Sequence, residues 1–514
     1  MKLKLIIFSM LLLITFQSYS FEFTILHTND LHSYLTGQKD IGHYGRIVTK
    51  IKELREKNKI NILVDAGDFY GGTVYHWPGP RPTFSFPEWD FFKFNKYDAV
   101  TLGNHEFDAK DIGFINMLDK MDDSIPLVVS NSKNSHKKFK PHIIKKLNEG
   151  DNSLSVGIIG AIGPDACLVS RGNRSKFQFH GLKDGKADWE SFFKSLNVQI
   201  KSIKDKVDLI ILLLHGGGAE DEEIANRLGD IDIIIAGHTH EVYYKKVGET
   251  FISQAGSYGK YLGELVFNYN IETKKLDLIK KEHHIIDATV TKDREYMKKL
   301  PMYQEEVSQI AKEVGINISQ KYKKQKENPD DFKQFAVTQV YKDLIEKEPD
   351  IDLYFTVRGL VRNQIDLTSE FGFEDVFRVF PLGFHENFRP GERIVTFYVK
   401  RSDLGMIKDF LTLYSKKNRK FKPLFSSNVK FKERWWGLPL LNNYSEVLLN
   451  NSNESEYVKI ATNEFVAKYI GLVKEKTFGL FQVDFLNKEG EVVSSPEIKK
   501  YPVYYYFSES LKSL

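Results

Sequence analysis

The sequence predicts an α/β protein with a layered N-terminal core, a helical linker and a second domain of mixed helix and strand. Three observations lead to this prediction. From Phe21 to about Asp287, short apolar runs alternate with longer amphipathic stretches. The segment Tyr296–Lys324 is polar, charged and favourable to helix, with no strand pattern. Strand-like runs and helical stretches then resume from about Asn328 to Leu514.

The apolar runs of the first part are short and bounded by polar residues, as buried strands of an α/β sheet are. The predicted strands are Phe23–Leu26, Ile60–Val64, Ala99–Leu102, Leu127–Val129, Val156–Ile162, Leu209–Leu214 and Ile231–Ala236. The predicted helices between them are Arg46–Lys57, Asp111–Met121, Trp189–Lys206 and Ala219–Leu228. In the second part we expect strands at Leu353–Thr356 and Ile394–Val399, a helix at Leu404–Tyr414 and an aromatic terminal strand at Tyr501–Phe507.

The first residues resemble an export signal rather than part of the fold. Lys2 and Lys4 give a basic start, and the apolar stretch Ile6–Phe16 is too short to span a bilayer. Small residues at positions 18 and 20 predict cleavage after Ser20 and a periplasmic or secreted product. The leader has no cysteine and the C-terminus is polar, so no stable membrane anchor is expected. The predicted segments are a leader at 1–20, a first domain at 21–290, a linker at 291–327 and a second domain at 328–514.

Composition excludes several classes of protein. The formal net charge of the 514 residues is +4, and two of the positive charges lie in the leader. This small excess gives no reason to expect a nucleic acid polymer as partner. Cys167 is the only cysteine, so an intrachain disulfide is impossible, and we expect a packed thiol.

Five short motifs follow apolar runs of the first domain. Each carries ionisable or amide side chains where an ordinary turn sequence would be enough to connect the elements. The motifs are Asp30-Leu31-His32, Gly67-Asp68, Gly103-Asn104-His105-Glu106, His215-Gly216 and Gly237-His238-Thr239-His240. Loops gather at the carboxyl ends of the strands of an α/β sheet, so these residues should meet at one edge. Burying so many ionisable groups together without a cation would cost several kcal/mol per group.

The motif residues are therefore predicted to hold metal. Imidazoles and carboxylates suit Zn, Mn, Fe or Co, and no thiolate is available there. Alternate residues of an extended segment point the same way, so Asp-x-His and His-x-His could each give two ligands to one centre. The glycines would allow close backbone approach. The remaining histidines, among them His27, His76, His283, His284 and His385, are interpreted as structural.

This ordered set of motifs resembles the calcineurin-like metallophosphoesterases. The longer strings Thr28–His32, Gly67–Thr73, Gly103–Asp108 and Gly237–His240, with Gly45-Arg46, are similar to the bacterial 5′-nucleotidase and UDP-sugar hydrolase family. The resemblance covers about residues 23–270. It implies an N-terminal four-layer α/β/β/α sandwich, two divalent metal ions and a C-terminal α+β substrate-binding domain.

The resemblance also implies a role for each matched residue. Asp68 would bridge the two metals, Asp30, His32 and His240 would complete one, and Asn104, His215 and His238 the other. His105 would face the phosphoryl group beside Asn104, stabilising charge and protonating the leaving oxygen. Asp108 and Glu106 would at most support these residues, and either could equally be a carboxylate of a turn or of the surface. The nucleophile would be a hydroxide that bridges the metals, because metal coordination brings the pKa of water near 7.

The second domain matches the family less well. Asp350–Phe355, followed by Val361–Ile365, is similar to the family's strand and glycine-rich arginine segment, and Pro381-Leu382-Gly383 to its next turn. On this match Arg362 would bind phosphate or substrate, although an ordinary surface arginine is the alternative. The late glycine-rich loop of the family is absent. Phe425 and Phe481 are the weak candidates for the two rings that stack on a base.

The leading hypothesis is a secreted phosphohydrolase that releases phosphate from a small ester, with a nucleoside 5′-monophosphate as the first choice of substrate. One alternative keeps the site and changes the ester to a 2′,3′-cyclic nucleotide, a UDP-sugar or a sulfur ester. The other is a catalytically silent protein that binds nucleotides or metals. The sequence leaves the oligomeric state open.

Overall fold

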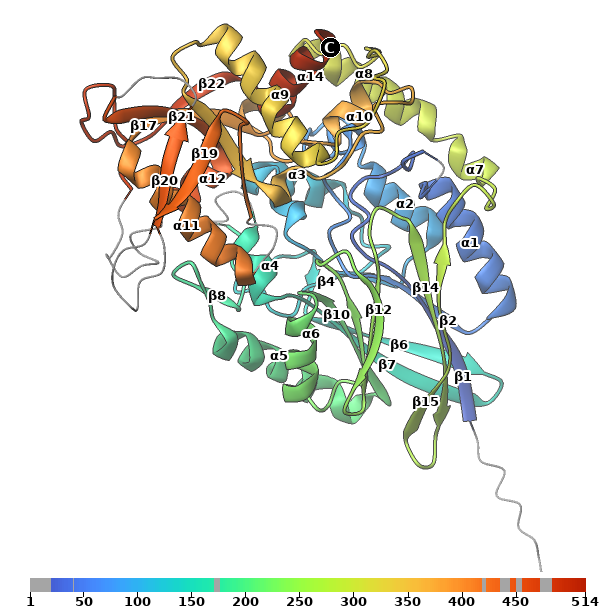
Figure 1. Cartoon of the computed structure of the whole chain (residues 1–514). Helices are drawn as coiled ribbons and strands as arrows, with labels where there is room; N and C mark the ends of the chain where they lie inside the picture. The colour runs from blue at the N-terminus through green and yellow to red at the C-terminus, as the bar shows by residue number, and fades with distance from the viewer. Residues whose placement is uncertain are drawn as a thin grey trace, which may run out of the picture.

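The computed structural model of the chain describes residues 20–39, 41–170, 176–417, 422–434, 444–449, 455–471 and 483–514. Two sheets form the centre of the N-terminal part (Figure 1). The first has the order β15 (Lys275–Ile285), β14 (Tyr261–Asn270), β1 (Ser20–Thr28), β2 (Asn61–Asp65), β3 (Ala99–Val100), β4 (Leu127–Val128), β5 (Phe139–Lys140). The second has the order β12 (Val242–Val247), β13 (Thr250–Ala255), β11 (Ile233–Ala236), β10 (Leu209–His215), β7 (Asn152–Ile162), β6 (His142–Glu149).

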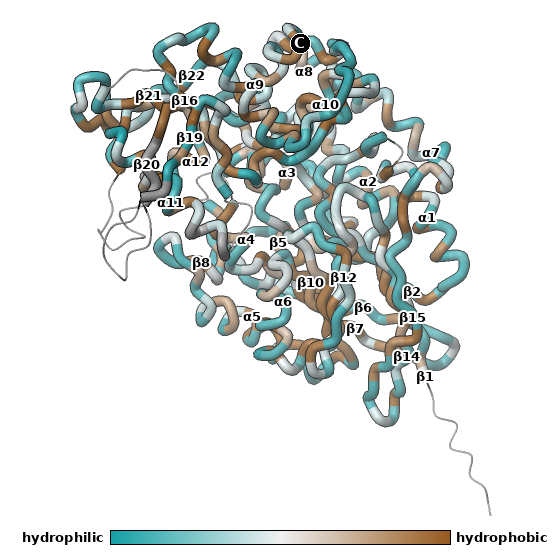
Figure 2. Tube along the Cα trace, viewed as in Figure 1, coloured by the Kyte–Doolittle hydropathy of each residue, from teal (hydrophilic) through white to brown (hydrophobic). Residues whose placement is uncertain are grey.

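The strands nearest the motifs run parallel, and both faces of each sheet are buried. In the first sheet, β1, β2 and β3 are parallel neighbours, and in the second, β10 is parallel to β7 and β11. Alternate residues of β1 serve different cores: Ile25 packs between the two sheets, and Leu26 packs on the other side of the first sheet. This double burial explains the apolar runs, which appear as brown stretches along the strands in Figure 2.

Helices cover the outer faces of the two sheets. The helical elements of this part are α1 (Tyr44–Lys57), η1 (Val74–His76), α2 (Pro87–Asn95), η2 (His105–Phe107), α3 (Lys110–Lys120), α4 (Pro164–Val169), α5 (Trp189–Ile203), η3 (Lys204–Lys206) and α6 (Ala219–Arg227). Residues of α1, α2 and α3 share a core with the first sheet, and residues of α5 and α6 share one with the second. The four-layer α/β/β/α arrangement is thus confirmed. A small hairpin, β8 (Leu182–Lys183) with β9 (Lys186–Ala187), lies at the side.

The connecting segment is only partly helical. It contains α7 (Arg294–Met297) and α8 (Leu300–Val314), and α8 ends at Gly315 with a left-handed φ of 74°. The prediction of helix as far as Lys324 was wrong at this point, because glycine in that conformation ends a helix. The helix is also more than a spacer, since Tyr303, Val307 and Ile310 are buried against the N-terminal part.

The C-terminal part is an α+β layer packed on the first (Figure 1). Its sheet has the order β18 (Pro423–Phe425), β16 (Leu353–Val357), β21 (Tyr457–Asn463), β17 (Arg393–Lys400), β22 (Glu497–Pro502), and β19 (Val429–Arg434) pairs with β20 (Tyr444–Leu449). Its helical elements are α9 (Phe332–Lys347), η4 (Arg358–Leu360), α10 (Phe373–Phe377), η5 (Glu386–Phe388), α11 (Arg401–Lys417), α12 (Glu464–Gly471) and α14 (Val503–Lys512).

The predicted aromatic terminal strand Tyr501–Phe507 was wrong. Within this segment only Tyr501 and Pro502 are in a strand, as the last residues of β22, and α14 begins at Val503. The buried residues Val503, Tyr504, Phe507 and Leu511 recur at helical spacing. Pro502 supplies an extended N-cap, and the chain ends by packing this face on α9 and α10.

The remaining predictions concern the leader and the cysteine. Residues 1–19 of the predicted leader lie outside the described residues, and Ser20 pairs with Asn270 at the start of β1. Within the described ranges, no helix combines the length and the apolar character that a membrane span requires. Cys167 is fully buried on α4, where it belongs to the main hydrophobic core.

An ion-pair group on β14 and β15 predicts a pH dependence of stability. The buried Glu264 carboxylate accepts hydrogen bonds from Lys280 (2.6 Å) and His284 (2.9 Å). Burial opposes its charge, but these two partners lower the pKa of Glu264 to about 2, against 4.5 for a free side chain. The lowered pKa stabilises the fold above pH 4.5, and this stabilisation is lost as the pH falls from 4.5 towards 2.

We expect Glu264→Gln to lower the free energy of unfolding by about 1–2 kcal/mol at pH 7, after allowance for solvent around Lys280. The difference from wild type should shrink as the pH falls below 4.5, because the wild-type carboxylate then gains a proton. Urea unfolding of both proteins at pH 7, 5 and 3.5 measures it. A deficit that stays constant over this range would contradict the assignment. Glu282 approaches the same pair, but Lys280 already neutralises Glu264, so we interpret the group as an ion-pair network.

Candidate active site

The first group of candidate ligands consists of Asp30, His32 and His240, whose ligand atoms lie within 4.8 Å of one another. His32 Nε2 is 3.8 Å from Asp30 Oδ1 and 3.1 Å from His240 Nε2. Asp30 and His32 come from the loop after β1, and His240 from the loop after β11. The group therefore joins the edges of both sheets. Its nitrogen and oxygen donors suit a divalent first-row metal.

The second group consists of Asp68, His215 and His238, again within 4.8 Å. Asp68 Oδ2 is 3.1 Å from His215 Nε2 and also 3.8 Å from His32 Nε2 of the first group. Asp68 thus borders both groups, as a ligand shared by two metals must. Burial opposes its charge, but His215 and His105 hold the pKa of Asp68 well below its usual value. The residue is therefore an anion in this site.

The ligand loops are turns rather than extended segments, contrary to the prediction from the alternating motifs. Asp30 and His32 have φ values of 51° and 47°, Asp68 has 55°, and His238 and His240 have 83° and 65°. Left-handed conformations of non-glycine residues cost about 1–3 kcal/mol each and persist only when their surroundings enforce them. Backbone hydrogen bonds between the loops do so, from Asp30 N to Gly67 O (2.9 Å) and from His32 N to Asp68 O (3.0 Å).

Two motif glycines are required by close packing at the centre. A Cβ at Gly103 would lie 2.2 Å from Asp68 Oδ1, and one at Gly237 would lie 2.8 Å from His215 Nδ1. Both distances are shorter than any van der Waals contact. The sequence predicted close approach at these glycines, and the structure identifies what approaches them.

Asn104 provides a test of whether the site suits a metal. Its side-chain Oδ1 is buried and has no hydrogen-bond partner among the described residues. A buried amide oxygen without a partner costs about 1–3 kcal/mol. A bound cation in contact with this oxygen would satisfy it. The residues present therefore fit divalent cations.

His105 lies beside Asp68 but has a different set of contacts. Its backbone N–H donates to Asp68 Oδ1 (2.8 Å), and its Nε2 is 4.0 Å from Asp68 Oδ2. Its Nδ1 is 2.8 Å from Asp108 Oδ2, which assigns the Nδ1 proton to that bond. Asp108 therefore orients the ring so that Nε2 faces the centre. Such an imidazole can exchange a proton with a bound substrate.

Glu106 supports the loops rather than the substrate. Its buried carboxyl group accepts the backbone N–H groups of Gly103 (2.5 Å), Asp68 (3.2 Å) and Tyr70 (3.1 Å). Burial and the nearby Asp68 raise its pKa well above the usual value. Glu106 thus joins the second and third motif loops into one unit.

Sequence reasoning missed the pair Ser33 and Glu88. Glu88, fully buried on α2, accepts the Ser33 hydroxyl, and Ser33 Oγ accepts the N–H of Gly71 (3.1 Å). The carbonyl of Gly71 accepts from His32 Nδ1 (2.8 Å), which leaves His32 Nε2 for the centre. Burial raises the pKa of Glu88 to about 8. In the sequence Glu88 directly follows Pro87, and acidic residues are common in the first turn of a helix. Nothing in the sequence therefore distinguishes Glu88 from an ordinary helix-start residue.

Arg362 reaches the centre from the C-terminal part. Its Nη2 lies 3.3 Å from His32 Nε2, and Tyr258 stands near both groups, with its ring centroid 5.5 Å from that of His32. The neighbouring Asn363 donates to the hydroxyl of Tyr34 (3.3 Å). The positively charged guanidinium of Arg362 therefore lies where it can contact an anionic substrate.

Of the two aromatic candidates, the structure describes Phe425, which lies away from the centre. Phe425 stacks on Phe355 at 5.2 Å between ring centroids and contacts Phe431 at 4.7 Å, within the core of the C-terminal part. Phe481 lies outside the described residues. The signal for both was an aromatic residue in a diverged region, and such a signal does not distinguish a core ring from a stacking ring.

Residues 23–242 match the family model of calcineurin-like phosphoesterases. This part of the chain is similar to the calcineurin-like phosphoesterases. The chain is 32% identical over 260 residues to the snake venom 5′-nucleotidase of Crotalus adamanteus, an alignment that covers 46% of this chain and 40% of the relative. The apyrase of Tabanus yao is 28% identical over 285 residues, with 48% of each chain covered. The chain thus spans half or less of the length of these curated relatives.

The fold similarity extends over the C-terminal part as well. The 5′-nucleotidase precursor of Thermus thermophilus superimposes with a TM-score of 0.71 and 18% identity, covering 96% of both chains. At this identity the likeness shows the fold alone. It shows that the phosphoesterase domain and the C-terminal part together form an arrangement found in solved 5′-nucleotidases.

Proposed function

We propose that the protein is a secreted phosphohydrolase that uses two divalent metal ions to release phosphate from nucleoside 5′-monophosphates. The observation that carries this proposal is that two ligand groups meet at Asp68, with His105 directly beside it. We assign the catalytic domain to residues 21–290, the linker to 291–327 and the substrate domain to 328–514. The predicted leader motivates export. The names of the relatives motivate the choice of a nucleotide.

In this proposal Asp68 would help to hold both metals. Asp30, His32 and His240 would complete the site of one, and Asn104, His215 and His238 that of the other. When bound, two such cations lower the pKa of water and neutralise phosphate oxygens, which is the chemistry that hydrolysis of a phosphate ester requires. The donor set accepts Zn, Mn, Co or Fe. No nucleophilic side chain is needed.

The chain's own residues complete the reaction. Arg362 presents a planar set of donors that matches two phosphate oxygens and so orients the phosphoryl group. His105 Nε2 donates a proton to the leaving oxygen, with its ring held by Asp108. The backbone hydrogen bonds among the loops keep these groups in place before the substrate arrives.

A substrate panel tests this function. The purified protein without its leader is given AMP, ADP, UDP-glucose, 2′,3′-cyclic AMP or p-nitrophenyl phosphate, each with Mn²⁺, with Zn²⁺ or with EDTA. We expect phosphate release with metal, none with EDTA, and a higher kcat/KM for AMP than for the generic ester. Failure to hydrolyse any ester with either metal would contradict the proposal. Preference for another ester would retain the chemistry and replace the substrate.

A further inference from the structure

Tyr258 has a backbone conformation that its surroundings must enforce. It lies in the loop between β13 and β14, and its φ is 61°. A bulky side chain at such an angle is an outlier, and strain of this kind persists only where neighbouring contacts hold it. The backbone N–H of Tyr258 donates to the carbonyl of Asp30 (2.7 Å), and a Cβ at Gly42 would lie 2.7 Å from the carbonyl oxygen of Tyr258. The Tyr258 loop is therefore fastened to the loop of the first ligand group.

The ring of Tyr258 packs among residues of the centre. Its centroid is 5.5 Å from that of His32 and 5.2 Å from that of His240. It stacks on Tyr34 with the ring centroids 4.3 Å apart and an angle of 24° between the ring planes. The guanidinium of Arg378 in turn lies 5.3 Å from the centre of the Tyr34 ring. These neighbours fix the Tyr258 ring and, with it, the position of the hydroxyl group.

The guanidinium of Arg362 meets side chains of the N-terminal part. Its Nη2 lies 3.3 Å from His32 Nε2, and a side-chain hydrogen bond joins Arg362 to Tyr258. A phenol hydroxyl is uncharged at neutral pH and can accept an N–H of a guanidinium. The backbone N–H of Arg362 donates to the carbonyl of Val379 (2.9 Å), so the main chain is already fixed. The direction of the guanidinium therefore depends on the contacts at the end of the side chain.

Of these two contacts, the one with His32 is incompatible with the proposed function. His32 Nε2 would help to hold a divalent cation, and the same lone pair cannot also accept a hydrogen bond from Arg362. The hydroxyl of Tyr258 is not assigned to a metal and stays available. An arginine side chain has several rotatable bonds, so a guanidinium without a fixed partner loses the orientation that matches two phosphate oxygens. The contact with Tyr258 is then the one that sets this orientation.

We propose that Tyr258 is a positioning residue, which aims the guanidinium of Arg362 at the phosphoryl group of the ester. Tyr258 acts through Arg362 and takes no part in the bond changes of the reaction. The role rests on the proposed phosphohydrolase function where turnover is concerned. It does not rest on that function where the binding of a phosphate anion is concerned.

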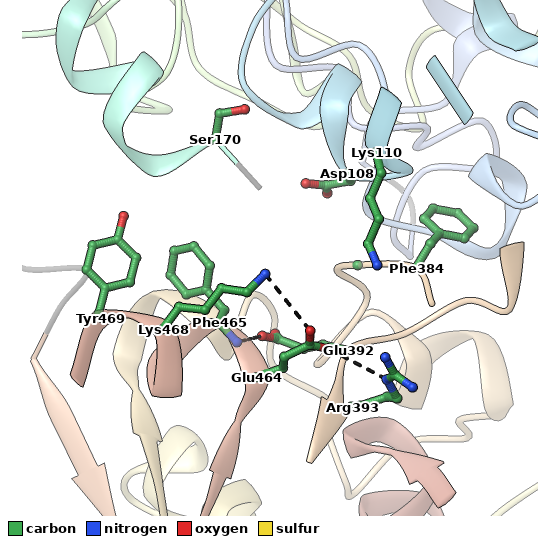
Figure 3. A pocket seen from close by; sticks show the side chains of 11 residues that line it. Asp108, Lys110, Ser170, Phe384, Glu392, Arg393, Glu464, Phe465, Lys468 and Tyr469 are labelled. Atoms are coloured by element: carbon green, nitrogen blue, oxygen red, sulfur yellow. Dashed lines mark hydrogen bonds and ion pairs between the residues drawn. The ribbon is translucent and has the colours of Figure 1, made fainter. Parts of the chain in front are cut away.

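Tyr258 and Arg362 are separate from the cavity of about 210 Å³ that Asp108 and Phe384 border in Figure 3. The described lining of that cavity includes neither Tyr258 nor Arg362. A group that is attached to the phosphate and lodged in the cavity would therefore meet neither residue. A change at Tyr258 should weaken different phosphate esters by the same factor, because all of them share the phosphoryl group.

The first variant is Tyr258→Phe, which keeps the ring and its stacking on Tyr34 but removes the hydroxyl. We expect kcat/KM to fall about 10-fold, because a hydrogen bond to a charged group is lost. The fall should be equal for AMP and for glycerol 2-phosphate, and it should come from KM, with kcat within about 3-fold of wild type. Bound Mn²⁺ per chain should equal that of wild type, because Tyr258 is outside both ligand groups.

A double-mutant cycle shows whether Tyr258 acts through Arg362. Arg362→Met removes the guanidinium, so adding Tyr258→Phe to it should change kcat/KM by less than about 2-fold. Tyr501→Phe is the matched control, because Tyr501 stacks on Tyr505 at 4.0 Å in the C-terminal part, and it should stay within about 2-fold of wild type. Additive losses from Tyr258→Phe and Arg362→Met would overturn the proposal, and so would a loss that differs between the two esters.

Binding of inorganic phosphate to the Mn²⁺-loaded protein, measured by calorimetry, separates this role from the proposed reaction. We expect Tyr258→Phe to bind phosphate about 10-fold more weakly than wild type. If no ester is hydrolysed but phosphate binding depends on the Tyr258 hydroxyl, the reaction is wrong and the positioning role stands. If esters are hydrolysed and Tyr258→Phe equals wild type in phosphate binding and in kcat/KM, the reaction stands and the positioning role is refuted. A wild-type protein that neither binds phosphate nor hydrolyses any ester would refute both.

Discussion

Replacement of Asp68 by asparagine is expected to lower kcat for phosphate release by about 10²–10³-fold or more. Asp68 Oδ2 faces His215 at 3.1 Å and His32 at 3.8 Å, so the change removes the one charge that both ligand groups share. Asparagine has nearly the same shape, and its Oδ1 can still accept the backbone N–H of His105. Steady-state kinetics on AMP with saturating Mn²⁺ measures the loss, and a thermal melt checks that the fold is intact.

The matched control for Asp68→Asn is Asp230→Asn. Asp230 is a 57%-exposed surface carboxylate near Lys204, and we expect its variant to remain within about 2-fold of wild type. An Asp68→Asn protein with the full rate would contradict the assignment of Asp68 as the shared ligand. Equal rates of phosphate release for Asp68→Asn and Asp230→Asn would also contradict that assignment.

The second large effect is expected for His105→Asn. Loss of a positioned proton donor typically lowers the rate about 10²–10⁴-fold. The loss should be greater for AMP than for p-nitrophenyl phosphate, since p-nitrophenolate leaves readily without a proton and an alkoxide does not. Metal content should be unchanged, because His105 Nδ1 is committed to Asp108 and the two ligand groups do not require its Nε2.

The control for this residue is His136→Asn, a partly exposed histidine outside the ligand groups, which should keep the wild-type rate on both esters. Equal losses of His105→Asn on the two esters would contradict proton donation and would leave only charge stabilisation. Loss of bound metal in this variant would instead make His105 a ligand.

The sequence was sufficient to predict the fold class and to find the residues of the centre. Parallel strands buried on both faces appear as apolar runs, and the polar residue after each run is easy to see. Asp30 after β1, Asp68 after β2 and His215 at the end of β10 are examples. Because β1, β2 and β3 are parallel neighbours, residues far apart in the chain arrive at one edge.

The features that escaped prediction depend on tertiary packing. Bonds between loops, not local propensity, hold the left-handed turns: the backbone N–H of Asp30 donates to Gly67, and the N–H of His238 donates to the Asp30 carboxylate. Glu88 acts through Ser33, which no spacing rule connects to it. The terminal helix α14 was mistaken for a strand because its aromatic residues have high β-propensity, and burial against α9 overrides that preference.

The number of divalent ions that the centre holds decides whether Asp68 joins two metal sites. Metal-free protein is reconstituted with Mn²⁺, passed through a desalting column and analysed for metal per chain, in parallel with Asp68→Asn and Asp230→Asn. We predict two ions per chain for wild type and for Asp230→Asn, fewer for Asp68→Asn, and phosphate release that rises only as the second ion binds. A wild-type protein that holds no more than one ion, or that releases phosphate at the full rate without any, would contradict the two-metal centre.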